Sequence, residues 1–292
     1  MGDLNVRVNL ISNLDENSRI EEISSPNQVY AWFLHKALIE EGIDAQFIKD
    51  TTIRQEDPPE ADHTIVVSAA TYTYMLSIKG YAEKLQESTS GKLVSYMNTE
   101  RMRGGDRWFD HCFTQIPPRV GGPKKYVCAG WGVDPAYCYP EQEEKAGFLD
   151  SRVLHTYIKV AMFTKVYRKY DSVLSQTDIR VYNPVPVYNK DKRIPYPEYQ
   201  AMLRKCHFFF CTQFGDGGLN RLEAAACGAL LVVPTKLYRK KTMRLLNHGV
   251  WNTESDLAKI LRRPVRIEEN RGRALEHTWG KVVNRILGVI AV

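Results

Sequence analysis

Apolar and polar positions along the first half of the chain predict an alternation of strands and helices. Short apolar runs typical of buried strands occur at 6–12, 43–48, 63–69 and 93–97. Longer segments at 26–41 and 74–86 carry apolar residues at helical spacing, and Gly42 ends the first of them. This order predicts a parallel sheet with helices on both faces, which is an α/β fold.

The alternation starts again in the second half. Predicted strands lie at 153–157, 179–182, 207–212 and 229–233, and predicted helices at 163–175, 197–205, 219–227, 251–261 and 274–289. The polar segment 140–150 separates the two halves and predicts a domain boundary. We therefore expect two α/β domains, at 1–140 and 141–273, and a C-terminal helical segment at 274–292.

Glycines frame the predicted helix at 219–227. Gly215, Gly217 and Gly218 precede it at the end of a predicted strand, and Gly228 follows it, where a left-handed cap is usual. The backbone N–H groups and the dipole at such a helix start favour a bound phosphate. The segment is therefore a candidate anion site, and its alternative is an ordinary glycine turn of an α/β unit.

Charge and glycine placement narrow the classes of ligand. The chain has 292 residues and a net charge of +6, which suits a phosphate-bearing ligand and equally a nucleic-acid surface. The loop after the first strand contains no glycine, so the dinucleotide fingerprint of nicotinamide and flavin enzymes is missing there. An oxidoreductase is therefore disfavoured.

Cysteine usage and hydropathy bear on the compartment. The six cysteines form no Cys-x-x-Cys pair, a pattern typical of reduced thiols. No apolar run approaches the roughly 18 to 20 residues of a membrane span, and the N-terminal residues show no signal-peptide pattern. We expect a cytoplasmic protein without a membrane span.

The segment from Gly215 to Pro234 resembles the donor-binding segment of GT-B glycosyltransferases of the retaining Glu-x7-Glu type. The positions that match the family phrase are Gly218, Leu219, Glu223, Ala224, Ala226, Gly228, Val232 and Val233. The family's first Glu is replaced by Gly215, and Asp216 is the nearest acidic residue. The resemblance therefore covers this segment closely and the rest of the chain diffusely.

The resemblance implies roles for the two acidic residues. Glu223 is expected to contact the ribose of a nucleotide-sugar donor, with UDP as the expected nucleotide; its alternative is a solvated helix carboxylate. Asp216 is expected near the transferred sugar, in place of the missing Glu, and is a candidate catalytic residue.

The diphosphate of such a donor needs compensating charge. The chain has no Asp-x-Asp pair, so no metal and no other cofactor is expected. Backbone amides and two lysines that match a family spacing are the expected donors, although the lysines are otherwise solvated helix residues. These candidates are Gly217, Gly218, Leu219, Lys159 and Lys165.

The resemblance also implies the architecture, with two Rossmann-like domains facing a central cleft and a final helix crossing back to the first domain. The phrase Gly-Val-Asp at 132–134 fits the family's connection between domains. The acceptor side is expected on loops that follow the first-half strands, with Asn13, Thr71 and Arg101 as candidates. Glu100 stands near the place where the family often carries a His, and is the second candidate catalytic residue, whereas His111 is interpreted as structural.

The function implied by the resemblance is metal-independent, retaining transfer of a sugar from a nucleotide-diphosphate sugar to a hydroxyl acceptor of unknown class. Two alternatives stay open. Basic clusters at 236–244 and 262–273, and the phrase Leu-Glu-x-x-Ala-Cys-Gly at 222–228, resemble features of phage DNA glucosyltransferases, which suggests a hydroxymethylated DNA base as acceptor. The missing first Glu suggests a degenerate protein that binds a nucleotide without transferring a sugar.

Overall fold

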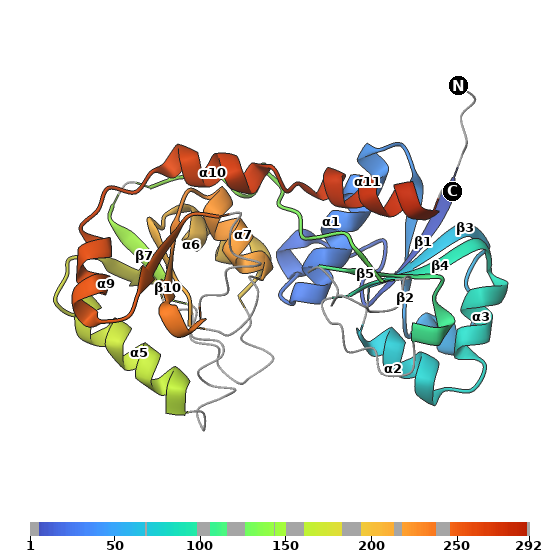
Figure 1. Ribbon diagram of the computed structural model, residues 1–292. Coiled ribbons are helices and arrows are strands. Elements are labelled where there is room, and N and C mark those ends of the chain that lie inside the picture. Colours follow the sequence, from blue (N-terminus) through green and yellow to red (C-terminus); the bar gives the residue numbers. More distant parts are fainter. Residues whose placement is uncertain are drawn as a thin grey trace. The chain divides into compact units, whose positions relative to one another are not determined.

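The computed structural model describes residues 6–67, 69–97, 106–115, 126–142, 144–149, 161–182, 194–212, 218–237 and 246–290. The chain divides into two compact units (Figure 1). Unit 1 runs to Gly132 and includes the chain from Trp279 onward, and unit 2 runs from Val133 to Thr278. The polypeptide therefore passes between the units twice, and a parallel bridge pairs Val133 with Thr278 at the unit 2 side of both passages.

Unit 1 contains a six-stranded parallel sheet, which confirms the predicted α/β class. Its strands follow the order β2-β1-β3-β4-β5-β6, with bounds β1 (Arg7–Ser12), β2 (Asp44–Lys49), β3 (Ala61–Val66), β4 (Thr89–Met97), β5 (His111–Thr114) and β6 (Tyr126–Cys128). Its helices are α1 (Pro26–Glu40), α2 (Ala69–Ser77), α3 (Tyr81–Glu87) and α11 (Trp279–Ile290). Parallel crossovers are right-handed, so the reversal of strand order at β1 sends α1 and the α2–α3 pair to opposite faces.

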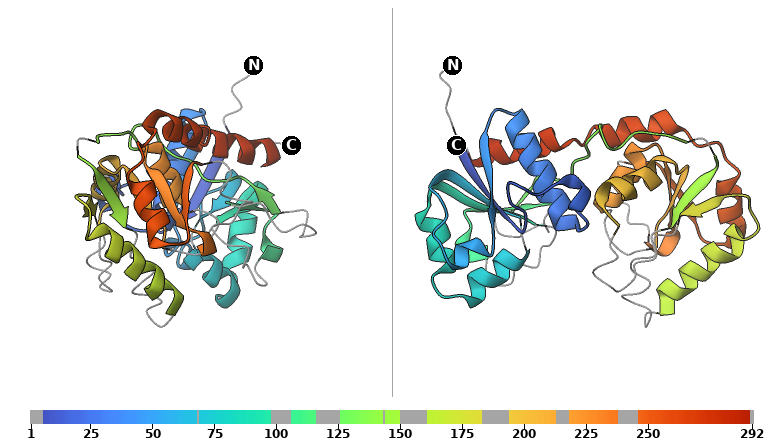
Figure 2. Two further views of the ribbon diagram at one scale, coloured as in Figure 1. Left: turned by 60° about the vertical axis from the view of Figure 1, so that its left-hand side comes forward. Right: turned by 180° about the vertical axis from the view of Figure 1, so that it is seen from behind.

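The last helix, α11, packs against α1 in unit 1 (Figures 1 and 2). Trp279, which is 4% exposed, anchors the contact: its ring stacks on Phe33 at 6.0 Å between centroids and lies 6.3 Å from both Tyr30 and Tyr96. Gly132 passes so close that a Cβ there would lie 2.6 Å from the Trp279 backbone. The aromatic cluster thus ties the C-terminal segment to the body of unit 1.

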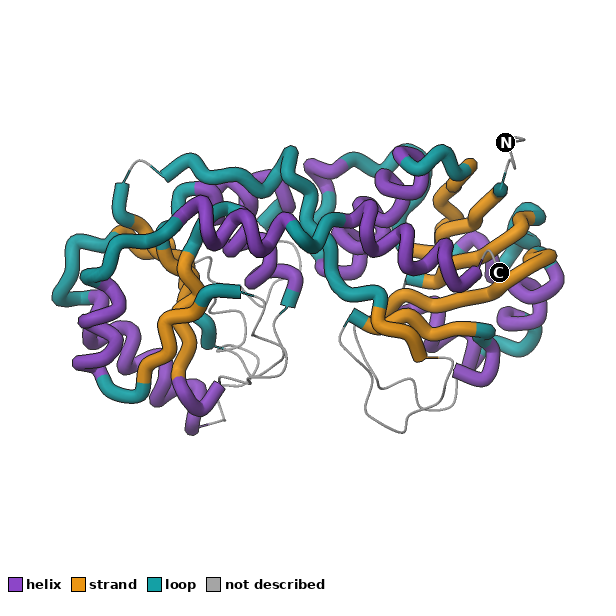
Figure 3. The backbone as a smooth tube through the Cα atoms, turned by 45° about the horizontal axis from the view of Figure 1, so that its top comes forward, coloured by secondary structure: helices purple, strands orange, loops and turns teal. Residues whose placement is uncertain are grey.

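Unit 2 contains a five-stranded parallel sheet in the order β11-β10-β9-β7-β8. Figure 3 draws the strands in orange. The strands are β7 (Ala146–Leu149), β8 (Arg180–Tyr182), β9 (Phe208–Phe210), β10 (Leu230–Pro234) and β11 (His248–Trp251). The helices are α5 (Ala161–Leu174), α6 (Tyr196–Arg204), α7 (Leu219–Ala226), α9 (Glu254–Leu261) and α10 (Ile267–Leu275). The central strand β9 is buried on both faces, which accounts for its three consecutive Phe residues. Phe208 and Phe210 belong to the core cluster that includes side chains of α5 and α9, whereas Phe209 stacks on Phe148.

Several predicted elements differ from the observed ones. The predicted helix at 74–86 is two helices, because Gly80 adopts a positive φ of 81° between them. The segment predicted as a linker at 140–150 contains the fully buried strand β7, which lies between β9 and β8 inside the sheet. The predicted helix at 251–261 begins only at Glu254, after strand β11 and a Thr253 capping box.

At the C-terminus the predicted helix 274–289 is also divided. Helix α10 ends at Leu275, and α11 begins at Trp279. The two helices are separated by the segment at Thr278, whose backbone pairs with Val133. The predicted strand at 153–157 lies outside the described residues.

The predicted left-handed cap of the 219–227 helix is confirmed. Gly228 has a φ of 87°, and a Cβ there would lie 2.5 Å from Cγ2 of Ile267 on α10. We expect Gly228→Ala to lower the free energy of unfolding by about 1–2 kcal/mol from the left-handed backbone alone, and further because Ile267 must move. Urea denaturation provides the measurement.

Gly42→Ala is the matched control for this substitution. Gly42 has a φ of 78°, and a Cβ added there would meet no heavy atom within 4 Å, so only the backbone contribution applies. Equal losses of stability in the two variants would show that the contact between Gly228 and Ile267 contributes nothing.

Candidate functional site

Helix α7 begins at the point of unit 2 where the strand order reverses. The chain runs from β7 outward to β8, and then returns to β9 on the other side of β7. Ligands of open parallel sheets bind beyond the carboxyl ends of the strands at such a reversal. Helix α7 follows β9 and leads to β10, so its N-terminus lies at this edge of the sheet.

The first residues of α7 have the geometry of an anion-binding helix start. Gly218 occupies the N-cap with extended backbone, and its carbonyl accepts from the N–H of Arg221 at 3.0 Å. Leu219 is the first helical residue and is buried. The first turn contains no acidic side chain, so the positive end of the helix dipole is not offset within the turn.

Glu223 is buried on the second turn of the same helix. Only 2% of the residue is exposed, so its interpretation as a solvated helix carboxylate is wrong. Its Oε1 accepts a hydrogen bond of 2.7 Å from the hydroxyl of Tyr196, the first residue of α6. Burial, followed by the charge of Glu223, raises the pKa of Tyr196 well above its usual value, so the hydroxyl remains a donor.

A group of thiols and an amide lies next to this pair. Gln200, on α6, accepts through Oε1 from the thiols of Cys138 at 3.5 Å and Cys227 at 4.0 Å. A hydrogen bond with Cys227 and burial raise the pKa of the Cys138 thiol, with further contributions from Glu223 and Asp134. Both cysteines are free and buried, and the raised pKa of Cys138 keeps that thiol protonated.

Two side chains fasten the C-terminal end of α7. Nη1 of Arg271 on α10 donates to the carbonyls of Ala226 at 2.8 Å and Cys138 at 2.6 Å. Nε2 of Gln142 donates to the carbonyls of Cys206 and Cys227. These bonds satisfy carbonyls at the helix end and hold α7 against its neighbours.

Arg221 places a positive charge in the first turn of α7. The residue is only 4% exposed, and the family resemblance assigns it no role. Burial, together with the Arg221 charge, lowers the pKa of His248 on β11 to about 4, which keeps that imidazole neutral at pH 7. Its charge also acts on Tyr170, so the guanidinium lies near the side chains of β11 and α5.

The structure brings together three of the predicted donor residues: Gly218, Leu219 and Glu223 all lie on α7 or its cap. Lys165 lies on α5 and is exposed. The other predicted donor-side and catalytic residues lie outside the described part of the chain, and these are Asp216, Gly217, Lys159 and Glu100.

The acceptor-side candidates belong to unit 1. Asn13 is exposed directly after β1. Thr71 on α2 is fully buried, and its hydroxyl interacts with the hydroxyl of Tyr81, so its side chain faces the core. Arg101 lies outside the described residues. His111 begins β5, as predicted.

The basic cluster at 262–273 is only partly solvated. Arg266 and Arg273 pair with Glu269, both at 3.2 Å, and Arg271 binds the carbonyls at the end of α7. Arg262 and Arg263 are exposed. In the other cluster Lys236 is exposed, and its remaining members lie outside the described residues.

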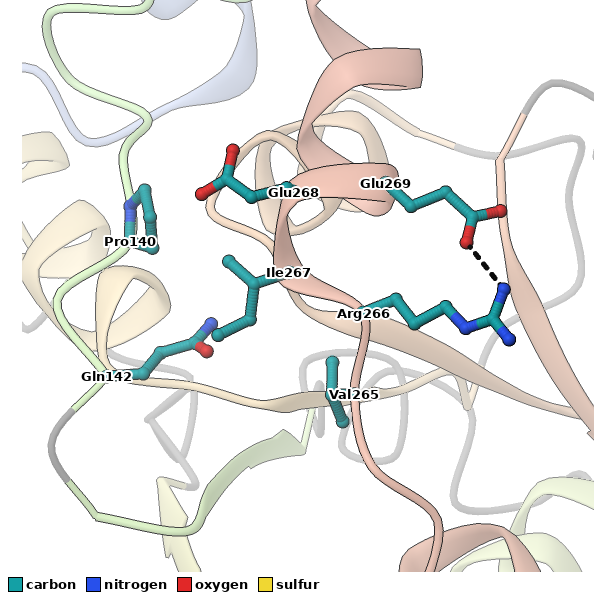
Figure 4. A pocket seen from close by; sticks show the side chains of 7 residues that line it. All are labelled: Pro140, Gln142, Val265, Arg266, Ile267, Glu268 and Glu269. Carbon is teal, nitrogen blue, oxygen red and sulfur yellow. Dashed lines mark hydrogen bonds and ion pairs between the residues drawn. The ribbon is translucent and has the colours of Figure 1, made fainter.

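A shallow pocket of about 540 Å³ lies at the other end of α7 (Figure 4). Ile267, which lines the pocket, also lies close to Gly228, the C-terminal cap of the helix. Its lining residues are Pro140, Gln142, Val265, Arg266, Ile267, Glu268 and Glu269. None of the predicted donor residues lines it, so we distinguish this pocket from the site at the start of α7.

The described part of the chain contains neither a candidate membrane-spanning helix nor a candidate metal-binding group. No helix among those residues is long and apolar enough to cross a membrane. The same residues contain no group of three or more His, Cys, Asp or Glu side chains placed to hold a metal ion.

Two solved structures share the fold over nearly the whole chain. The spinosyn forosaminyltransferase SpnP has a TM-score of 0.51 at 12% sequence identity, covering 99% of this chain and 100% of its own. MurG from Acinetobacter baumannii has a TM-score of 0.50 at 9% identity, covering 98% of this chain and 99% of its own. The chain has the GT-B fold. No protein-family model and no curated protein matches the sequence.

Proposed function

We propose that this GT-B protein transfers a sugar from a nucleotide-diphosphate sugar to a hydroxyl acceptor. The observation that carries the proposal is the buried Glu223 on a glycine-capped helix at the strand reversal of unit 2. A carboxylate at this place can accept the two hydroxyls of a ribose. The GT-B fold supports the proposal by analogy alone, because proteins of one fold can have many different functions.

The chemistry assigned to the chain is charge stabilisation. As the glycosidic bond breaks, negative charge builds on the leaving diphosphate, and the start of α7 offers backbone amides and a helix dipole. The second proposed source of charge is the pair Lys159 and Lys165. We propose no metal for this step, because the chain has no Asp-x-Asp pair.

In a retaining reaction the leaving phosphate itself takes the proton of the acceptor hydroxyl. We propose this course, with Asp216 close to the transferred sugar and Glu100 on the acceptor side, together with Asn13 and Arg101. UDP is the proposed nucleotide. Thr71 supports the acceptor side only through the packing of α2, because its side chain is buried.

The test is thermal unfolding with UDP-, GDP- and ADP-sugars in the presence of EDTA. A ligand at about 100 times its Kd stabilises the native state by about 2.7 kcal/mol, which for a unit of this size raises the Tm by about 5–10 °C. We expect one nucleotide series to give this shift. Unchanged Tm values with every member of the panel would contradict the proposal.

A second candidate is a degenerate protein that binds the nucleotide but transfers nothing, which the glycine at position 215 favours. Nucleotide binding without any hydrolysis or transfer product would select it. A DNA acceptor rests on the basic clusters, of which Arg266, Arg271 and Arg273 already have partners within the protein. Binding to duplex DNA that weakens steeply with salt is expected for that alternative.

A further inference from the structure

The hydroxyl of Tyr196 and the carboxylate of Glu223 form a buried pair that no sequence pattern indicates. They lie 27 residues apart on α6 and α7, and Tyr196 is 4% exposed. We propose that Tyr196 is a positioning residue for nucleotide-sugar binding, which holds the Glu223 carboxylate ionised and in a single orientation. This inference rests on the proposed role of Glu223 at the ribose.

The physical basis is the burial of the carboxylate. A buried carboxyl group favours its neutral form unless hydrogen-bond donors compensate the charge. The Tyr196 hydroxyl supplies one such donor, through a bond of 2.7 Å to Oε1. Because it fixes Oε1, the bond sets the orientation in which the carboxylate is presented to a ribose hydroxyl.

Tyr196 is itself held in place by its surroundings. It starts α6 directly after Pro195, whose ring restricts the backbone at the helix entry. Its ring lies 5.9 Å from that of Tyr137 and 6.3 Å from that of Tyr199. A hydroxyl fixed by such packing is a better positioning group than a mobile one.

Several other titratable or charged groups surround the pair and are part of its electrostatics. Glu223 interacts with Tyr196 of α6 and with the thiol of Cys138, and the Asp134 carboxylate in turn acts on that thiol. Cys227 ends its own helix, and Arg271 of α10 reaches the carbonyls of Ala226 and Cys138. The hydroxyl of Tyr196 donates to the Glu223 carboxylate at 2.7 Å, so it is the group that the inference concerns.

The test removes only the hydroxyl. In Tyr196→Phe the Glu223 carboxylate loses a donor to its charged form, so we expect its pKa to rise relative to the wild type. Carbon-13 NMR of glutamate-labelled, ligand-free protein follows this titration, and Glu223→Gln identifies the resonance. No nucleotide is needed for this measurement.

The second readout is affinity for the UDP-sugar at two pH values. Ribose binding requires the ionised carboxylate, so a raised pKa makes affinity fall as the pH is lowered. For Tyr196→Phe we expect the Kd to weaken by a larger factor between pH 8 and pH 6 than in the wild type, by up to about tenfold for each unit that the Glu223 pKa rises. In the wild type, where the inference has Tyr196 keeping the carboxylate ionised, the Kd values at the two pH values should agree within about twofold.

Tyr170→Phe is the matched control. Tyr170 is fully buried in the same unit, but its hydroxyl donates to the backbone carbonyls of Val232 and Cys211. The variant should lose thermal stability as Tyr196→Phe does. It should leave the Glu223 titration and the pH dependence of the Kd unchanged.

Each result has a separate meaning. The same Glu223 titration in Tyr196→Phe and wild type would overturn the inference, and so would a shifted titration without any change in the pH dependence of binding. If the titration shifts but the wild type binds no nucleotide-sugar, the proposed function fails, while the effect of Tyr196 on the carboxylate stands.

Discussion

Glu223→Gln is expected to weaken nucleotide-sugar binding by about tenfold to a hundredfold. A hydrogen bond to a charged group contributes about 1.5–3 kcal/mol, and each 1.4 kcal/mol corresponds to a factor of ten in Kd. The amide keeps the shape of the side chain and can still accept from Tyr196, so the fold should be retained. Isothermal titration calorimetry measures the change directly.

Glu223→Ala should add a folding defect to the same binding defect. Removal of the carboxylate leaves the buried Tyr196 hydroxyl without its acceptor, which costs about 1–3 kcal/mol of stability. Comparing the Gln and Ala variants therefore separates the binding role of the carboxylate from its structural role.

Glu268→Gln is the control for both Glu223 variants. Glu268 is an exposed carboxylate on α10 that lines the pocket at the opposite end of α7. Its replacement should leave the Kd unchanged. A loss of affinity in Glu268→Gln with normal affinity in Glu223→Gln would place the nucleotide in that pocket and contradict the assignment to the helix start.

Trp279→Ala is expected to cost unit 1 about 3–5 kcal/mol of stability, the range for removing a buried Trp. The indole packs among Phe33, Tyr30 and Tyr96, so its loss opens a cavity where α11 joins the unit. Hydrogen–deuterium exchange of the intact chain should show reduced protection in β1, β3 and β4.

Unit 2 is the internal reference for this variant. Strands β9 and β10 belong to a separate core, so their protection should not change. Trp279→Phe should recover part of the loss, because a ring can still stack on Phe33. Equal loss of protection in both units, or none in unit 1, would be inconsistent with this role of Trp279.

Local sequence patterns are sufficient to predict the bounds of helices that have clear capping residues at both ends. Helix α1 has Pro26 at its start, a Ser25–Gln28 capping box and Gly42 beyond its end, and its predicted bounds lie close to the observed ones. Strand β7 escapes prediction because its four residues directly follow a strongly polar stretch. Helix α10 escapes it because most of its residues are polar, and burial of Asn270 and Ala274 depends on packing against α7.

The residues of the candidate site likewise fall into two groups, those that a local motif identifies and those that come together only when helices pack. Gly218, Leu219 and Glu223 are adjacent on one helix, so a local motif identifies them together. Tyr196 and Arg271 reach α7 from other helices, 27 and 45 residues away from their partners. No periodicity along the chain encodes such contacts, because they form only when the helices pack. The burial of Thr71 is likewise invisible in the sequence, since it follows from the position of Tyr81.

The most direct test of the central claim is a crystal structure of the protein with UDP, or with whichever nucleotide gives the largest thermal shift. We predict that a ribose hydroxyl lies within about 2.6–3.2 Å of the Glu223 carboxylate, and that the diphosphate rests against the N-terminus of α7 at Gly218 and Leu219. A nucleotide bound elsewhere, with Glu223 still bonded to Tyr196 and distant from the ligand, would contradict the account.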